Sequence, residues 1–135
     1  MSGGGRILAI DHGAARCGCA VCDPSGTIVR PIEAIEPTEA EAVARVARAQ
    51  GAEEIVLGLP VSLNGEEGAQ ARVVRGFGEE LAALLDEIPV SFFDERFTTR
   101  QAQESRRGGA SAAEDSLAAA HLLEAYLLTR EAARR

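Results

Sequence analysis

The five residues Ile55-Val56-Leu57-Gly58-Leu59 form an uninterrupted apolar run in the middle of the chain. A run of this kind is typical of a strand that is buried on both faces of a sheet. The segments before and after it have helical spacing, so we expect helical crossovers to connect it to its neighbouring strands. Such crossovers favour a mixed sheet with a parallel portion, and therefore an α/β fold.

Four other segments have the composition of strands. They are residues 6–11, 17–22, 27–35 and 89–94. The turn sequence Asp23-Pro24-Ser25-Gly26 predicts that the second and third strands form a hairpin, because Pro presets φ and Gly permits a positive φ. A chain of 135 residues can bury one core, so we expect residues 1–135 to form a single domain.

Helical patterns separate and follow the later strands. Thr38-Glu39-Ala40-Glu41 begins the first helix with a capping-box pattern. Its predicted inward face consists of Ala40, Val43, Ala44 and Ala47. The second helix covers roughly 66–86, with a predicted inward face of Ala69, Val73, Phe77, Leu81 and Leu84. A short helix from about Thr98 and a final helix from about 112 to 131 complete the pattern.

Three acidic residues stand where a carboxylate is costly unless something positive meets it. Asp11 and Glu95 follow the apolar ends of predicted strands. Asp115 comes directly after the capping box Ser111-Ala112-Ala113-Glu114 and shares a helix face with apolar residues. Those apolar residues are Ala118, Ala119, Leu122 and Tyr126. A divalent metal ion is the simplest partner for all three carboxylates, although an acid at the position of Asp11 is also a common turn residue.

The carboxyl ends of parallel strands share one edge of a sheet, where open α/β sheets bind ligands. If the strands that end near Asp11, Leu59 and Asp94 are parallel neighbours, this edge brings Asp11 and Glu95 together. Asp94 is then either a reserve metal ligand or the residue that fixes an arginine.

The net charge of −7 argues against broad, nonspecific binding of nucleic acid. All 14 basic residues are Arg, so any phosphate contact must use guanidinium groups. The segment from Arg96 to Arg107 has a surplus of Arg beside Glu95, and it predicts local binding of nucleic acid. A solvated helix face is the alternative interpretation of the same segment.

The remaining composition restricts the class of protein. Cys17, Cys19 and Cys22 lie on a predicted strand where Cys22 points away from the other two, so we interpret them as small buried thiols. His12 and His121 lack the spacing of a zinc site and are interpreted as structural or incidental.

No stretch approaches the roughly 20 apolar residues of a membrane span, and we expect a cytoplasmic protein without a membrane partner.

The first strand and the hairpin, with Asp11-His12-Gly13 and Asp23 to Gly26, resemble the phosphate-binding hairpin of sugar kinases and actin-like ATPases. Those enzymes close two lobes over a nucleotide, whereas this chain supplies one. An actin-like nucleotide-phosphate-binding domain is therefore the weaker alternative.

Four groups of residues, in order along nearly the whole chain, together resemble the YqgF family. They are Ile7–Asp11 with Gly13, Arg16 and Gly18; Val56–Pro60 with Asn64-Gly65; Asp94-Glu95-Arg96 with Thr98-Thr99; and Asp115, Ala118 and Ala119 with Tyr126-Leu127. Members of this family are described as Holliday junction resolvases and as nucleases that mature the precursor of small-subunit ribosomal RNA. The chain departs from the family pattern at Ala15, where many members carry Lys, and at 111–114, where a basic run is common.

The resemblance implies a ribonuclease H-like fold with a five-stranded mixed sheet in the order 3-2-1-4-5. It implies a metal-dependent nuclease in which Asp11, Glu95 and Asp115 are catalytic and bind Mg²⁺ or Mn²⁺, with two ions expected. Many other members of the superfamily have an acid at the end of strand four. This chain has Gly58-Leu59-Pro60 there, and the next strand supplies Glu95 instead.

We expect the substrate to contact Arg16, Arg96, Thr98 and Asn64. The resemblance favours RNA, within a ribosomal precursor particle, over a DNA junction, whose resolution would require a homodimer. A non-catalytic RNA- or ribosome-binding module that retains the fold is the main alternative function.

Overall fold

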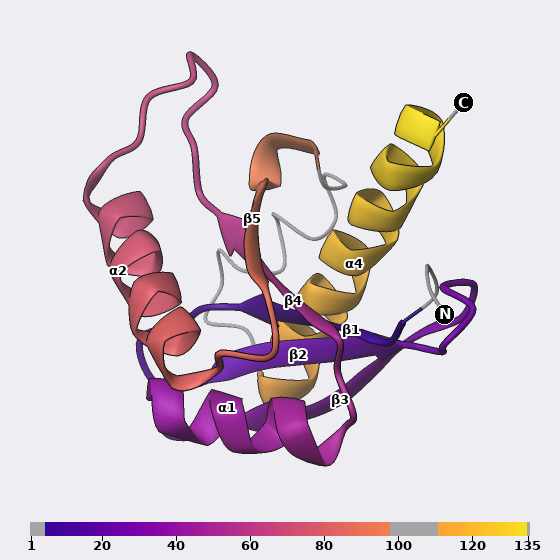
Figure 1. Ribbon diagram of the computed structural model, residues 1–135. Coiled ribbons are helices and arrows are strands. Elements are labelled where there is room, and N and C mark those ends of the chain that lie inside the picture. Colours follow the sequence, from indigo (N-terminus) through magenta and orange to yellow (C-terminus); the bar gives the residue numbers. More distant parts are fainter. Residues whose placement is uncertain (1–4, 98–110, 135) are drawn as a thin grey trace.

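A computed structural model of the chain describes residues 5–97 and 111–134, and its centre is a five-stranded sheet (Figure 1). The strands are β1 (Ile7–Asp11), β2 (Cys17–Cys22), β3 (Val29–Ile35), β4 (Glu54–Leu59) and β5 (Val90–Asp94). Their order in the sheet is β3-β2-β1-β4-β5, which confirms the order predicted from the sequence. The helical segments within the described residues are α1 (Ala40–Ala49), α2 (Ala69–Leu84), the 3₁₀ turn η1 (Glu95–Phe97) and α4 (Ala112–Arg134).

The sheet has an antiparallel half and a parallel half. β2 pairs antiparallel with both β1 and β3, while β4 pairs parallel with both β1 and β5. The carboxyl ends of β1, β4 and β5 therefore share one edge, which we call the carboxyl edge; the opposite edge is the amino edge. This arrangement confirms the parallel portion that the helical crossovers predicted.

The hairpin between β2 and β3 closes through Asp23. Its Oδ1 accepts hydrogen bonds from the amides of Thr27 and Ile28, both at 2.8 Å, and its Oδ2 accepts one from the hydroxyl of Ser25 at 2.6 Å. Gly26 has a φ of 75°, as the turn sequence predicted. The hydrogen bonds from Ser25 and from the backbone lower the pKa of Asp23 to about 2.

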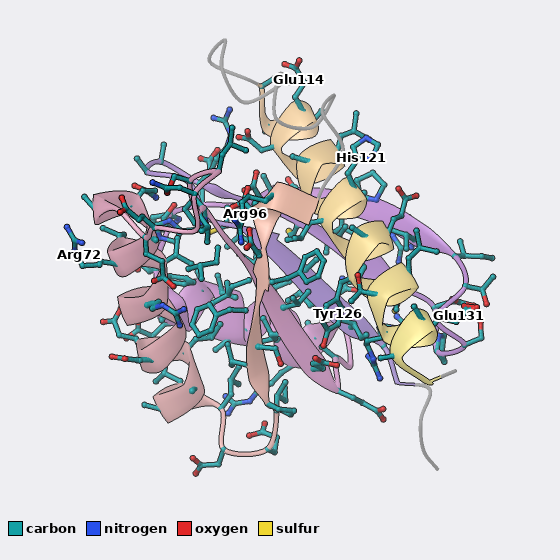
Figure 2. All side chains as sticks on the ribbon, turned by 90° about the horizontal axis from the view of Figure 1, so that it is seen from above. Arg72, Arg96, Glu114, His121, Tyr126 and Glu131 are labelled. Carbon is teal, nitrogen blue, oxygen red and sulfur yellow. The ribbon has the colours of Figure 1, made fainter. Side chains whose placement is uncertain are left out.

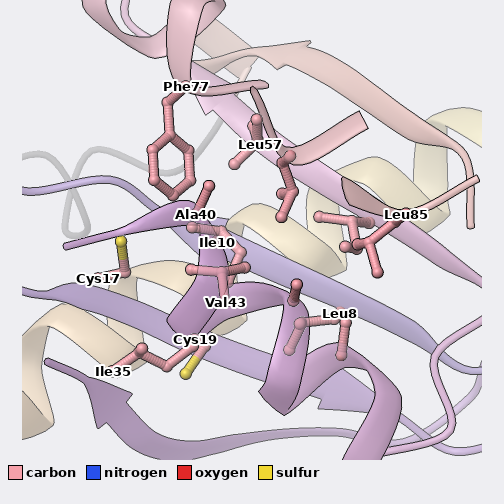
Figure 3. Close-up of a cluster of buried hydrophobic side chains, with 14 of the residues drawn as sticks. Leu8, Ile10, Cys17, Cys19, Ile35, Ala40, Val43, Leu57, Phe77 and Leu85 are labelled. Atoms are coloured by element: carbon pink, nitrogen blue, oxygen red, sulfur yellow. The ribbon is translucent and has the colours of Figure 1, made fainter. Parts of the chain in front are cut away.

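Helices cover both faces of the sheet (Figure 1). α1 and α2 cover one face, where the larger core cluster lies; Figure 3 shows its centre, including Leu8, Ile10 and Leu57. α4 crosses β1, β2 and β3 on the other face, where Ala119, Leu122 and Leu123 are buried. β1 and most of β4 are buried on both sides, which explains why the run at Ile55–Leu59 is apolar throughout.

The predicted capping box of α1 is wrong. The helix begins at Ala40 after Glu39, and no side chain caps its first turn. The Thr38 hydroxyl instead donates to the carbonyl of Gly13 at 2.8 Å. The Thr38 hydroxyl, which the capping-box pattern assigned to the first turn of α1, thus binds a carbonyl that is distant in sequence. This hydrogen bond links the start of α1 to the loop after Asp11.

The predicted inward face of α2 is only partly right. Phe77 and Leu81 are buried, but Val73 is 52% exposed and Leu84 is 40% exposed. The other buried residues are Ala71, Val74 and Gly78. The helix approaches the sheet at Gly78, where an added Cβ would lie 2.5 Å from Cζ of Phe92. The close approach of α2 to β5 at Gly78 determines which face of α2 is buried. The spacing of hydrophobic residues alone did not predict this approach.

Two other local predictions, the capping box of α4 and the burial of the cysteines, are confirmed. Ser111 and Glu114 form the predicted capping box of α4, because the Ser111 hydroxyl accepts from the Glu114 amide and the Glu114 carboxylate accepts from the Ser111 amide. All three cysteines are free and buried, with Cys22 on the opposite face from the other two. The helix predicted from about Thr98 lies outside the described residues.

Candidate active site

Asp11 lies in β1 between glycines of the two neighbouring strands. Gly18 of β2 is its register partner, and the parallel register of β1 with β4 places Gly58 on its other side. Side chains alternate along a strand, and Ile7 and Ala9 pack toward α4, so Asp11 points to the α4 face as well. It is 8% exposed, at the carboxyl edge of the sheet.

The first turn of α4 lies directly on Gly18. An added Cβ at Gly18 would lie only 2.1 Å from the carbonyl oxygen of Asp115. The next residue, Ser116, is buried, and its hydroxyl accepts a hydrogen bond from the amide of Cys19 at 3.2 Å. These two contacts hold Asp115 beside the strand pair that contains Asp11.

Glu95 reaches the same level of the sheet from the other side. It begins η1, directly after β5, and is 8% exposed. An added Cβ at Gly58 would lie 3.0 Å from Oε2 of Glu95 and 3.1 Å from its Cδ. The carboxylate of Glu95 therefore lies over β4, next to the strand that carries Asp11.

The structure thus brings Asp11, Glu95 and Asp115 to one level of the carboxyl edge, and we call these three residues the acid cluster. The positions beside Asp11 are glycines, and the space that their side chains would fill is taken by Asp115 and Glu95. Carboxylate oxygens are the donors that Mg²⁺ and Mn²⁺ prefer, so the residue types fit such an ion. As the side chains are placed, residues 5–97 and 111–134 contain no group of three His, Cys, Asp or Glu that could hold a metal ion.

Arg16 and Asp115 form an ion pair at the acid cluster. Nε of Arg16 donates to Oδ2 of Asp115 at 2.8 Å, and both side chains are about a quarter exposed or less. The pair joins the loop after β1 to the first turn of α4. The arginine predicted to contact phosphate therefore holds one of the predicted metal ligands.

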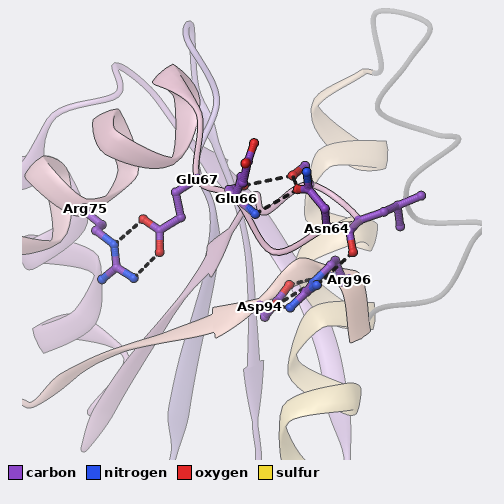
Figure 4. Close-up of polar contacts among 8 residues, drawn as sticks. Asn64, Glu66, Glu67, Arg75, Asp94 and Arg96 are labelled. Carbon is purple, nitrogen blue, oxygen red and sulfur yellow. Dashed lines mark hydrogen bonds and ion pairs between the residues drawn. The ribbon is translucent and has the colours of Figure 1, made fainter.

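Arg96 is bound by Asp94 at the end of β5. Its Nη2 and Nε donate to Oδ2 of Asp94 at 2.6 and 2.8 Å, and its Nη1 donates to the carbonyl of Leu63 at 3.2 Å (Figure 4). The hydrogen bond from the Arg96 side chain is the main reason that the pKa of Asp94 is lowered. Of the two roles predicted for Asp94, the structure shows the one in which it fixes an arginine.

Asn64 lies in a closed loop between β4 and α2. Its Oδ1 accepts from the Glu66 amide at 3.1 Å and from the Ser62 hydroxyl, and Gly65 turns the chain with a φ of 89° (Figure 4). An antiparallel bridge joins Val61 to Glu67 at the base of this loop. The side chain predicted to contact substrate thus supports its own turn. Thr98, the remaining predicted contact, lies outside the described residues.

The loop after Asp11 is packed on its other face. The ring of His12 meets the ring of Phe77 edge-on, with their centroids 4.8 Å apart. Burial lowers the pKa of His12, so the imidazole is neutral near pH 7. Among the described residues, its Nδ1 is buried without a hydrogen-bond partner. His12 thus faces the α2 side, away from the acid cluster.

The sequence analysis included Gly18 and Gly58 in the family pattern but did not recognise that they leave space beside Asp11, and it did not identify Ser116. The two glycines carried a usable signal, because a glycine inside a buried strand often marks the close approach of another group. Ser116 carried none, since its partner Cys19 is 97 residues away in sequence.

A second polar cluster, formed by Glu54, Ser91, Tyr126 and Arg130, lies at the amino edge. The carboxylate of Glu54 accepts from the Tyr126 hydroxyl, from Ser91 at 3.2 Å and from Arg130 at 3.1 Å. The guanidinium of Arg130 also lies over the Tyr126 ring, 5.7 Å from its centroid. Figure 2 shows Glu114 at the beginning of α4 and Tyr126 toward its end, so the two clusters lie near opposite ends of this helix.

A groove at the other end of the sheet is also remote from the acid cluster. It has a volume of about 550 Å³ and lies between the β2–β3 hairpin and the end of α4, with Thr27, Val29 and Leu127 in its walls. The acid cluster lies instead at the carboxyl edge of the sheet, and no residue of the cluster lines this groove. None of the helices in the described residues is long and apolar enough to cross a membrane.

Comparison with known proteins adds a family to this geometry. The family model described as RuvX, Holliday junction resolvase, matches residues 5–129. A protein of Thermobifida fusca is 42% identical over 109 residues, which cover 79% of this chain and 69% of the relative. A protein of Rubrobacter xylanophilus is 40% identical over 128 residues, which cover 91% and 92%. Both relatives carry the name "Putative pre-16S rRNA nuclease".

Solved structures show the same fold at low sequence identity. The structure of Thermus thermophilus RuvC in complex with a Holliday junction substrate aligns with a TM-score of 0.58 at 17% identity. The alignment covers 94% of this chain and 96% of RuvC. The ribonuclease H-like architecture expected from the sequence is thereby confirmed.

Proposed function

The chain belongs to the RuvX Holliday junction resolvase family, and from this premise we propose that it is a divalent-metal-dependent nuclease whose metal ligands are Asp11, Glu95 and Asp115. The observation that carries the proposal is the convergence of these three acids, from β1, η1 and α4, on one level of the carboxyl edge. Carboxylates that lie close together repel one another, and a divalent cation relieves this repulsion. A cluster of this kind is therefore better explained by a bound cation than by stability.

The chain's own residues would prepare this reaction in three ways. Asp11, between its two strand neighbours, would bind both expected ions, while Glu95 and Asp115 would each hold one. Two bound Mg²⁺ or Mn²⁺ ions supply the activation of a water molecule and the stabilisation of the leaving oxygen. Arg16, which is joined to Asp115, brings a guanidinium group to the place where a phosphate would lie. Arg96 orients the neighbouring loop through Leu63 and offers its remaining surface to the substrate backbone.

For the substrate, we favour the precursor of small-subunit ribosomal RNA. The relatives with about 40% identity bear the name of a pre-16S rRNA nuclease. A ribosomal precursor particle in the cytoplasm is the corresponding partner. A four-way DNA junction is the second substrate, as the family's description implies, and its resolution would require two copies of the chain.

A non-catalytic RNA- or ribosome-binding module is the second candidate function. The two internal ion pairs favour it, because Arg16 and Arg96 each bind a protein carboxylate rather than standing free for phosphate. The net charge of −7 points the same way. In such a module the acid cluster would be retained only as part of the scaffold.

A cleavage panel separates the two functions. Single-stranded RNA, a precursor-rRNA 5′ fragment, single-stranded DNA and a four-way DNA junction would be incubated with the protein and Mn²⁺, Mg²⁺ or a chelator. The nuclease predicts cutting that needs metal, is lost in Asp11→Asn and is retained in the exposed control Asp86→Asn. Folded protein that binds the RNA but cuts none of the four substrates would support the binding module.

A further inference from the structure

Gly58 occupies the position of β4 that faces the acid cluster. Its register partner in β5 is Phe93, which packs on the α4 face of the sheet together with Val56. Side chains of β4 alternate between faces, so a side chain at position 58 would point to the same face as Asp11. Position 58 is therefore the place on β4 from which a side chain would enter the cluster.

The side chain of Glu95 occupies that place instead. An added Cβ at position 58 would lie 3.0 Å from Oε2, 3.1 Å from Cδ and 3.1 Å from Cγ of Glu95. These separations are tighter than an ordinary van der Waals contact. Since Glu95 is 8% exposed, its side chain has little room to move aside.

Gly18, Gly78 and Gly58 differ in the groups that an added Cβ would meet. At Gly18 an added Cβ would meet the main chain of Asp115 at 2.1 Å, so a substitution there would displace α4 itself. At Gly78 it would meet the ring of Phe92, which belongs to the core. At Gly58 the three nearest atoms all belong to the acidic side chain of Glu95. Gly5 faces the side chain of Glu53 in the same way, but it precedes β1, at the opposite end of that strand from Asp11.

We propose that Gly58 is a positioning residue for Glu95: by lacking a side chain, it leaves the space over β4 in which the Glu95 carboxylate joins the acid cluster. Position 58 and residue 95 are then two alternative points from which one carboxylate can be delivered to the same place. An added Cβ at position 58 lies 3.1 Å from Cδ of Glu95, and a carbon–carbon bond is about 1.5 Å long, so the carboxylate carbon of an Asp at position 58 would lie within about three bond lengths of the one it replaces. The metal-binding part of this inference rests on the proposed function.

The first test uses metal-free protein and asks whether the two positions touch. Urea unfolding is measured for wild type, Gly58→Ala, Glu95→Ala and the double variant. Because truncation of Glu95 removes the atoms that the new methyl group would meet, Gly58→Ala should lower the midpoint in the wild type and not in the Glu95→Ala background. Additive shifts would overturn the proposal, whatever the protein's function is.

The second test moves the carboxylate and measures binding of Mn²⁺ alone by calorimetry. Gly58→Ala should weaken binding about tenfold, as displacement of a supporting group typically does, and Glu95→Ala should weaken it further. Gly58→Asp combined with Glu95→Ala should restore affinity to within a few-fold of wild type. Gly76→Ala is the control, because an added Cβ there has nothing within 4 Å.

The outcomes separate the two proposals. Failure of the relocated acid to restore binding, in a protein that the urea experiment shows to be folded, would overturn the role of Gly58 while leaving the nuclease intact. Wild-type protein that binds no Mn²⁺ would instead count against the proposed function, and the urea cycle would still decide whether Gly58 makes room for Glu95.

Discussion

The two polar clusters near opposite ends of α4 use the same chemical group for different purposes. At the amino edge, one carboxylate, Glu54, accepts hydrogen bonds from Ser91, Tyr126 and Arg130. At the carboxyl edge, three carboxylates from distant parts of the chain converge on one level of the sheet. The first arrangement joins α4 to β4 and β5, whereas the second gathers like charges that repel one another.

This difference separates an acid that supports the fold from the three acids for which we propose a function. Glu54 is surrounded by donors that satisfy its oxygens, so it stabilises the fold at neutral pH. Carboxylates brought together repel one another even where one of them, Asp115, accepts from Arg16, and natural proteins tolerate such a group where function requires the charge. Burial alone does not distinguish the amino-edge cluster from the acid cluster, because the carboxylates of both are mostly buried.

The largest effect should come from Glu95→Gln. Loss of a residue that supports a metal ligand can lower activity about 100-fold, and we expect the loss of Glu95 itself to lower the cleavage rate by more than this. The melting temperature should stay the same or rise, because the substitution removes one of several like charges. Initial cleavage rates and melting curves of the same preparations check both parts. Glu80→Gln on the exposed face of α2 is the control. A Glu95→Gln protein that melts much earlier would make Glu95 a structural acid.

Glu54→Ala should show the opposite pattern. The hydroxyl of Tyr126 and the guanidinium of Arg130 would lose their shared acceptor, which should lower the free energy of unfolding by about 1–3 kcal/mol. Cleavage per folded molecule should be unchanged. Urea denaturation followed by circular dichroism measures the loss, with the exposed neighbour Glu53→Ala as control. Equal stability of the two variants would contradict the anchoring role.

Alkaline pH should weaken the amino-edge cluster selectively. Burial, and then the hydrogen bond to Glu54, raise the pKa of Tyr126 to about 12. Because the folded state favours the protonated phenol, this stabilisation is complete below the ordinary pKa of about 10 and is lost as the pH rises from there toward 12. Tyr126 is the only Tyr and the chain has no Trp, so near-ultraviolet absorbance reports its ionisation directly.

A companion variant sharpens the titration. In Glu54→Gln the midpoint of Tyr126 should move down toward its ordinary value, because the neighbouring negative charge is gone while the burial remains. A wild-type midpoint near 10 would show that the phenol is not held by Glu54.

The smallest effect should follow Arg96→Gln at the carboxyl edge. Arg96 is exposed and an exposed ion pair contributes little to stability, so the free energy of unfolding should barely change. The pKa of Asp94 should rise toward its ordinary value, and the amides of Gly65 and Glu66 should exchange faster because the loop loses its link to β5. Nuclear magnetic resonance measures both quantities. Arg48→Gln, which breaks the exposed pair with Glu87, should leave them unchanged.

Much of the fold could be predicted because its signals are local. The five strands, their order and the hairpin at Asp23–Gly26 followed from apolar runs, turn residues and a family resemblance, and the structure confirms them. The capping box at Ser111 is confirmed, whereas that at Thr38 is wrong. The two capping-box patterns look alike in sequence. They differ in the structure because the Thr38 hydroxyl donates to the carbonyl of Gly13 instead of capping a helix, whereas the Ser111 hydroxyl caps α4.

The candidate site divides in the same way. Asp11, Glu95 and Asp115 were identifiable from their places at strand ends and at a helix start, since the carboxyl ends of parallel strands share an edge. Their contacts were not. Arg16 was predicted to bind phosphate, yet its ion pair joins it to Asp115, which is 99 residues away in sequence.

The sequence by itself determined which segments are strands and helices, which strands are parallel and which acids lie at the edge. These properties depend on residue type, periodicity and connection length, which are written along the chain. Only the tertiary structure decided the partners of Arg16 and Arg96, the anchoring of α4 by Glu54 and the space that Gly58 leaves for Glu95. These depend on distances between atoms of remote segments, and a hydrogen bond or a steric contact changes with displacements of a few tenths of an ångström that no local pattern encodes.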